Sequence, residues 1–203
     1  MKKGLGTNPW FSMWVKPRET IGKIINFNVN HRFGILCYIY GLQYIFQVFQ
    51  QMSFSKSFSL PASILIALVL AFPVGYILLN LFSFFIFLLG KIIKGKATFK
   101  QVRAANFWAS VPNVVMLALW IVLMFTIGSQ VFVTGYEAAL MGSTAYINKG
   151  VQLGSIVLGI WGFIIFLHAL GQVQGFSAWM ALLNCFLSGI AIFGIYVLIV
   201  SLL

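Results

Sequence analysis

The sequence is poor in charged residues and contains almost no acidic ones. Charged residues make up 7% of its 203 residues, and 13 Lys and Arg face only two acidic side chains, Glu19 and Glu137, with no Asp. Soluble domains carry about 25% charged residues, whereas this chain is 61% hydrophobic and has a mean hydropathy of +1.00. The composition therefore predicts an integral membrane protein rather than a soluble domain.

Side chains for the common catalytic and metal sites are equally scarce. Glu19 precedes the first long apolar run and Glu137 follows the third, so the two carboxylates are expected on opposite sides of a membrane. The other candidates stand singly along the chain: His31, His168, Cys37 and Cys185. None of them shows the paired His or Cys spacing of a metal site. We therefore predict no enzyme activity, no cofactor and no metal ion.

Five apolar runs are long enough to cross a bilayer, which takes about 20 residues per helix. They cover residues 33–52, 60–90, 112–133, 151–171 and 177–203. Backbone groups in lipid must be satisfied within helices, so the sequence predicts an all-α polytopic membrane protein with a bundle of five transmembrane helices. The expected organisation is a cytoplasmic N-terminal segment over 1–32 and a five-span membrane domain over 33–203.

The basic residues predict how this bundle is oriented. Eleven of the 13 Lys and Arg lie in 1–32 and 91–110, which share one side of a five-span chain, and only Lys56 and Lys149 lie on the other side. Because Lys and Arg are retained on the cytoplasmic side, we expect the N-terminus in the cytoplasm and the C-terminus outside. In so apolar a chain, basic flanks favour contact with anionic lipid over binding of nucleic acid.

The segment before the first run has the pattern of a helix lying on the membrane. Pro17 suits the first position of a helix, and Ile21, Ile24 and Ile25 share one helical face. Trp10 and a basic flank accompany this face. The pattern predicts an amphipathic helix in the cytoplasmic interface.

The segment between the second and third runs is predicted to be a basic cytoplasmic elbow. Thr98 and Gln101 have the spacing of a capping box, which would begin a helix leading into the third span. Together with the N-terminal segment, the elbow supplies a candidate face for membrane or partner binding: Lys16, Arg18, Lys91, Lys94, Lys96, Lys100 and Arg103.

Uncharged polar residues recur inside the apolar runs. Gln43, Gln47 and Gln50 are spaced to share one face of the first predicted span. The candidate intramembrane polar set is Gln43, Gln47, Asn80, Asn113, His168 and Asn184. Polar groups facing lipid are costly, so these side chains should turn inward. Two interpretations stay open: hydrogen bonds that join helices, or the lining of a cavity for a solute or lipid headgroup.

Small residues in the second run predict close contact between helices. Ala67, Ala71 and Gly75 are spaced by four, which lets two helix backbones approach each other. The pattern fits either packing within one chain or the interface of a homo-oligomer.

Two stretches resemble a known family. Residues 8–20 read Asn-Pro-Trp-Phe-Ser-Met-Trp-Val-Lys-Pro-Arg-Glu-Thr, and residues 95–112 run from Gly-Lys-Ala-Thr-Phe to Ser-Val-Pro. They resemble the opening and the elbow of the prokaryotic branch of the Yip-type proteins, a family named for interaction with Ypt/Rab GTPases. The residues that carry the resemblance are Asn8, Pro9, Trp10, Pro17, Arg18, Glu19, Thr20, Phe99 and Pro112.

The resemblance implies five spans, a cytoplasmic N-terminus and a non-enzymatic protein that binds protein partners or shapes and organises the membrane. The chain departs from the eukaryotic branch, because it has no Asp and carries 106–108 as Asn-Phe-Trp where that branch has a Gly-Tyr pair. We therefore expect a bacterial cytoplasmic membrane rather than Rab-dependent traffic. The alternative is a small transporter or lipid-translocating protein that uses the polar intramembrane residues.

Overall fold

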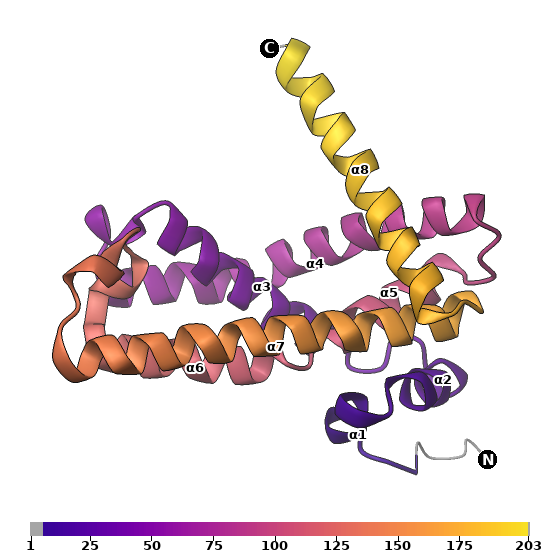
Figure 1. Ribbon diagram of the computed structural model, residues 1–203, viewed down its shortest axis with the longest axis horizontal. Coiled ribbons are helices and arrows are strands. Elements are labelled where there is room, and N and C mark those ends of the chain that lie inside the picture. Colours follow the sequence, from indigo (N-terminus) through magenta and orange to yellow (C-terminus); the bar gives the residue numbers. More distant parts are fainter. Residues whose placement is uncertain (1–5, 203) are drawn as a thin grey trace. The chain divides into compact units, whose positions relative to one another are not determined.

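The structure, a computed structural model, describes residues 6–202 as helices and connecting turns, with no strand among them. The α-helices are α1 (Pro9–Val15), α2 (Pro17–Phe27), α3 (Phe33–Gln51), α4 (Leu60–Ile92), α5 (Phe99–Ala109), α6 (Asn113–Ile127), α7 (Gly142–Gln174) and α8 (Ala178–Leu202) (Figure 1). Three short 3-10 helices are η1 (Phe54–Lys56), η2 (Gly128–Phe132) and η3 (Tyr136–Ala139). The all-α prediction is confirmed. The outer ends of two predicted segments, 1–5 of the N-terminal segment and 203 of the last span, lie outside the described residues.

Four helical stretches of the described chain are long and apolar enough to cross a membrane. They are Leu60–Ile92, Phe99–Phe132, Gly142–Gln174 and Ala178–Leu202. The helix α3, which has 19 residues and corresponds to the first predicted span, is not among them. Its second half carries four glutamines, which lower its apolar character: Gln43, Gln47, Gln50 and Gln51. The protein is therefore an integral membrane protein, and the five-span count depends on α3.

The chain forms two compact units, and α4 and α7 contribute to both. The described residues of unit 1 lie within 1–33, 78–111 and 163–203, and unit 2 comprises 34–77 and 112–162. Unit 1 thus contains α1, α2, α5, α8 and the second halves of α4 and α7. Unit 2 contains nearly all of α3, the first halves of α4 and α7, and α6 with the 3-10 helices.

In unit 1 the short helices pack on each other. The helix α5 is almost wholly buried, and its Phe107 and Trp108 are fully inaccessible to solvent. The helix α2 packs against α5, and its Ile21 and Ile24 are fully buried while Ile25 is half-buried. The helix starts at Pro17 as the sequence predicts, but its apolar face is covered by protein. A position in the membrane interface stays a prediction.

In unit 2, α3 and α4 approach each other at glycines. A Cβ atom on Gly41 would collide with the backbone oxygen of Ala71, and one on Gly75 with that of Cys37. Ala67 and Ala71 are fully buried. The close helix contact expected from the small residues of the second run is therefore confirmed, and it lies within one chain.

Two of the long helices extend beyond the apolar runs. The helix α4 has 33 residues, about 50 Å at 1.5 Å per residue, and continues through Pro73. The helix α7 starts at Gly142, nine residues before the predicted span. The added residues include Asn148, which is buried and accepts a hydrogen bond of 2.7 Å from the Tyr136 hydroxyl. The extension of α7 beyond the apolar run is thus packed against the preceding loop.

Candidate functional site

Arg18 joins α2 to the turn between α7 and α8 in unit 1. Its Nε donates to Nδ1 of His168 at 3.5 Å, and its Nη2 donates to the carbonyl oxygen of Phe176 at 2.9 Å. A Cβ atom on Gly171 would lie 2.8 Å from the same Nη2, so glycine leaves room for the guanidinium there. Arg18 is half-buried and acts as a connection between helices.

Arg103 has a similar role on α5. Its Nη2 donates to Oδ1 of Asn30 at 2.6 Å and its Nη1 to Oδ1 of Asn80 at 3.2 Å. The guanidinium carbon lies 4.4 Å from the ring centroid of Phe33 and 5.8 Å from that of Phe99. Planar guanidinium groups suit such combined hydrogen bonding and stacking. Arg103 therefore holds α4, α5 and the start of α3 together.

The four lysines of the turn from α4 to α5 are arranged differently. We call Lys91, Lys94, Lys96 and Lys100 the lysine elbow; all four are exposed. The ammonium of Lys91 donates to the carbonyl oxygen of Gly95 at 3.3 Å, and no carboxylate among the described residues pairs with any of the four. The lysine elbow is thus a group of four uncompensated positive charges.

Lys16 lies apart from the elbow in the sequence, between α1 and α2, and is also exposed. Two turns on, Lys23 pairs with Glu19 at 2.6 Å, and this hydrogen bond and charge hold the pKa of Glu19 below its ordinary value. The pair is exposed on both sides, so it contributes little to stability.

The N-terminal motif residues start the two short helices. Asn8 caps α1 by accepting a hydrogen bond of 3.2 Å from the Trp10 backbone nitrogen, and Pro9 is buried at the first position. The Trp10 ring meets that of Trp108 edge-on at 5.7 Å. In α2, Thr20 is buried. These residues fix the helix starts and their packing on α5.

The elbow motif residues have the same kind of role. The capping box of Thr98 and Gln101 is present in full, with both reciprocal hydrogen bonds. Phe99 begins α5 and contacts the Phe87 ring at 6.1 Å. Pro112 stands directly before α6.

Two buried side-chain amides, of Gln174 and Asn184, form a cluster beside the backbone of the lysine elbow. Gln174, at the end of α7, accepts a hydrogen bond of 3.3 Å from the Ala97 nitrogen through its Oε1, and its carbonyl oxygen accepts one of 3.0 Å from the Lys96 nitrogen. Asn184 of α8 is fully buried beside it, and both amides lie where a side chain on Gly90 would extend. The cluster connects the elbow backbone to α7 and α8.

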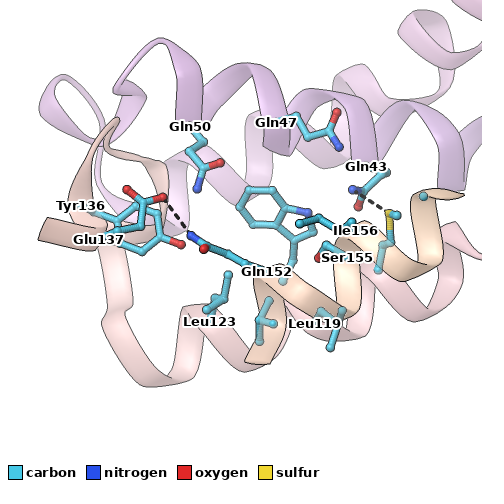
Figure 2. Close-up of a pocket in the computed structure, with 14 residues that line it drawn as sticks. Gln43, Gln47, Gln50, Leu119, Leu123, Tyr136, Glu137, Gln152, Ser155 and Ile156 are labelled. Atoms are coloured by element: carbon cyan, nitrogen blue, oxygen red, sulfur yellow. Dashed lines mark hydrogen bonds between the residues drawn. The ribbon is translucent and has the colours of Figure 1, made fainter. Parts of the chain in front are cut away.

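Unit 2 contains an open pocket with a volume of about 470 Å³ between α3, α6 and the first half of α7 (Figure 2). Its polar lining comes from three elements: Gln43, Gln47 and Gln50 of α3, Tyr136 and Glu137 of η3, and Gln152 and Ser155 of α7. Leu119, Trp120 and Leu123 of α6 form an apolar wall. The face that the glutamine spacing predicts on α3 therefore lines a pocket.

The three glutamines differ in their hydrogen bonds. Gln43 is buried, and its Nε2 lies 3.5 Å from the Met116 sulfur, while its Oε1 has no hydrogen-bond partner within the described chain. The Gln50 Nε2 donates to the carbonyl oxygen of Val131 at 3.2 Å. Gln47 lies between them and is exposed. Gln43 and Gln47 thus leave amide groups available to the pocket.

One end of the pocket carries an acidic side chain. Glu137 accepts a hydrogen bond of 3.4 Å from the Nε2 of Gln152 (Figure 2). Next to it, burial and the Glu137 charge raise the pKa of Tyr136 above its ordinary value. The Tyr136 hydroxyl therefore stays protonated at neutral pH, and it donates to Asn148.

The described residues contain no group of three His, Cys, Asp or Glu side chains that would hold a metal ion.

Residues 11–201 match the family model of the Yip1 domain. The chain belongs to the Yip1 domain family. No curated protein and no solved structure matches it. The Yip1 domain match covers both units, and it begins after the motif residues Asn8, Pro9 and Trp10. Membership in the prokaryotic branch stays a prediction.

Within the Yip1 domain, the predicted polar set does not form one group. Gln43 and Gln47 line the pocket of unit 2, and Asn113 starts α6 in the same unit but is not part of the lining. The other three lie in unit 1, where each has a separate neighbourhood: Asn80 at Arg103, His168 at Arg18, and Asn184 at Gln174.

The sequence interpretation did not identify several residues of these sites. Gln152 and Ser155 are three apart in α7, which is a helical spacing that would have placed both on one face. In the sequence, Glu137 stands as an isolated carboxylate far from Glu19. Gln174 is the last residue of α7 and stands immediately before Gly175, whose positive φ of 73° is typical of a helix C-terminus. No local signal indicates its contact with Ala97.

Proposed function

We propose that this Yip1 domain protein is non-enzymatic and organises the membrane by binding anionic lipid headgroups through its lysine elbow. The observation that carries the proposal is the contrast between exposed lysines and engaged arginines. Arg18 and Arg103 are half-buried and hydrogen-bonded, whereas the elbow lysines are exposed and have no carboxylate partner in the described part of the chain. Basic groups near an anionic surface contribute about 1 kcal/mol each.

The proposal includes a membrane topology. In this topology α3 crosses the membrane in addition to the four long apolar stretches, which gives five spans with α3 as the first. The N-terminus and the lysine elbow face the cytoplasm, and the C-terminus lies outside. The distribution of Lys and Arg supports this orientation, since 11 of 13 fall on the proposed cytoplasmic side. A bacterial cytoplasmic membrane is the proposed location.

The test uses the purified protein in nanodiscs of zwitterionic lipid, which expose both faces. Flotation with vesicles measures binding to anionic and to zwitterionic membranes. The double variant Lys96→Gln, Lys100→Gln should weaken binding to anionic vesicles by about 30-fold, because two lysines at about 1 kcal/mol each are lost. Raising the salt concentration should weaken binding of the wild type by screening.

A matched control is available in unit 2. The double variant Lys56→Gln, Lys149→Gln removes the same charge from the two lysines of unit 2 and should bind as the wild type does. Equal losses in both double variants would show a general effect of net charge. Binding that persists unchanged on zwitterionic vesicles would instead point to a protein partner or to adhesion without headgroup recognition, and both results contradict the proposal.

A further inference from the structure

The pocket of unit 2 has the size and the mixed lining of a site for a small organic molecule. Such sites have volumes of about 300 to 1,000 Å³, are mostly apolar and hold a few placed polar groups. Here the volume is about 470 Å³. Gln43, Gln47 and Gln50 point toward the pocket from α3, and Leu119 and Leu123 lie opposite (Figure 2).

Gln43 provides an acceptor that nothing in the described chain satisfies. Its side chain is 6% exposed, its Nε2 is directed to the Met116 sulfur, and its Oε1 is buried without a hydrogen-bond partner. A buried acceptor without a partner costs free energy that a bound donor recovers. The Gln43 end of the pocket therefore favours a ligand with a hydrogen-bond donor.

The charge at the other end narrows the class of ligand. Glu137 is the one ionisable carboxylate in the lining, and no Lys or Arg lines the pocket. The chain as a whole carries a formal charge of +11, so cations are repelled in general. A site that is acidic in so basic a protein selects a cation at that position.

The distance between the two ends sets the length of the ligand. Gln43 and Gln50 are seven residues apart on α3, or about 10 Å, and Glu137 lies at the Gln50 end (Figure 2). A ligand that satisfies both ends carries a cation and a second N–H donor about 10 Å apart. Between them, apolar Leu119 and Leu123 suit methylene groups, and Gln47 offers a further acceptor.

We propose that this pocket binds an aliphatic polyamine, with one ammonium group at Glu137 and another N–H group donating to Oε1 of Gln43. Polyamines alternate N–H donors with methylene segments, which matches one amide-bearing wall facing one apolar wall. The site lies in unit 2, apart from the lysine elbow, so the proposal does not rest on headgroup binding.

The test uses spermidine as the probe and the full protein in nanodiscs of zwitterionic lipid. Isothermal titration calorimetry should show saturable binding at one site, and the thermal unfolding midpoint should rise with spermidine concentration. Gln43→Met keeps the side-chain length but removes the acceptor, and we expect an affinity about tenfold lower. Glu137→Gln should lower the affinity as well.

Matched controls separate the site from general charge effects. Glu19→Gln removes the only other acidic charge, in unit 1, and Gln51→Met alters an exposed glutamine of α3 outside the pocket lining. Both should keep wild-type affinity. Magnesium ions carry charge without N–H donors and should not reproduce the thermal shift.

The proposal is overturned by an absence of saturable spermidine binding to the wild type, by equal losses in Glu137→Gln and Glu19→Gln, or by an equal shift with magnesium. If Gln43→Met does not fold, the comparison of the two glutamate variants decides by itself. The double variant Lys96→Gln, Lys100→Gln should bind spermidine as the wild type does, even where it no longer binds anionic vesicles. Failures of the two proposals are therefore distinguishable.

Discussion

At the scale of single residues, arginine and lysine are used for different purposes in unit 1. Arg18 and Arg103 each reach two acceptors from half-buried positions. The lysine elbow stays exposed. A guanidinium presents several donors in one plane and is more weakly hydrated than an ammonium, which explains why the arginines lie within the protein.

We predict that Arg103→Lys lowers the free energy of unfolding by about 1 to 3 kcal/mol. Lysine keeps the charge but cannot bond Asn30 and Asn80 in the same geometry, and hydrogen bonds to charged groups contribute in this range. Denaturant unfolding in detergent measures the change. Lys100→Gln, on an exposed position of the same helix, serves as the control; equal stabilities of the two variants would argue against a structural role for Arg103.

A second prediction concerns pH. His31 stacks on Trp108 with centroids 6.0 Å apart, and burial, with a smaller effect of the Arg32 charge, lowers its pKa below 6.5. The folded state therefore binds fewer protons than the unfolded state, and stability falls as the pH drops below about 6.5. The loss is complete below the folded-state pKa.

The variant His31→Phe should remove this part of the pH dependence. Its thermal midpoint, followed from pH 7.5 to pH 5, is expected to fall less than that of the wild type. Titration of Glu19 does not interfere, because its pKa lies below 4.5 and its stabilising effect is lost only under more acidic conditions. Parallel curves for the two proteins would show that His31 is not destabilised in its charged form.

Local residue roles were predictable where the signal is short in sequence. The Thr98 capping box and the helix start at Pro17 depend on neighbours within four residues, and both are present. The bond between Gln174 and Ala97 joins residues 77 apart. Nothing in either local sequence specifies that contact, so it required the structure.

At the scale of elements, the crossing of α3 and α4 depends on the absence of side chains at Gly41 and Gly75. The small residues of α4 predict a close approach to another helix. They do not specify which helix that is, or whether it belongs to the same chain. The backbone contact with Ala71 and Cys37 resolves this point.

We predict that Gly41→Ala is destabilising by about 1 to 3 kcal/mol, the usual cost of overpacking. The new Cβ meets backbone atoms, which have little freedom to move. The control is Gly194→Ala in α8, where a Cβ meets nothing within 4 Å and where alanine favours the helix by about 1 kcal/mol. Thermal unfolding of both variants in one detergent gives the comparison, and a neutral Gly41→Ala would mean that the helices lie farther apart.

Helix existence was more predictable than helix extent. Each of the five apolar runs contains a helix, because continuous hydrophobicity over about 20 residues is a strong signal. The early start of α7 was not predictable, since residues 142–150 lie outside the apolar run and the contact that buries Asn148 there, with Tyr136, joins residues 12 apart. The covered face of α2 was equally hidden, because amphipathicity does not distinguish protein from lipid as the apolar partner.

At the scale of the whole molecule, the sequence suggested one bundle, whereas the contacts define two units that share α4 and α7. The predicted polar residues are divided between them for this reason. Gln43 and Gln47 line a pocket in unit 2, while Asn80, His168 and Asn184 support the helices of unit 1. The Yip1 domain match covers both units.

The orientation of the protein in the membrane is the central claim, because the proposed cytoplasmic position of the lysine elbow depends on it. Five spans place the two ends of the chain on opposite sides, whereas four spans place them on the same side. Single cysteines at Lys16 and Ser201, in a background with Cys37→Ala and Cys185→Ala, report on the two ends. Lys149→Cys reports on the N-terminal end of α7.

The decisive measurement is labelling of these single cysteines in intact bacterial spheroplasts with a membrane-impermeant maleimide, before and after lysis. The account predicts that Ser201→Cys and Lys149→Cys react in intact spheroplasts and that Lys16→Cys reacts only after lysis. Equal protection of Lys16→Cys and Ser201→Cys, or labelling of Lys16→Cys from outside, would contradict the five-span arrangement with a cytoplasmic lysine elbow.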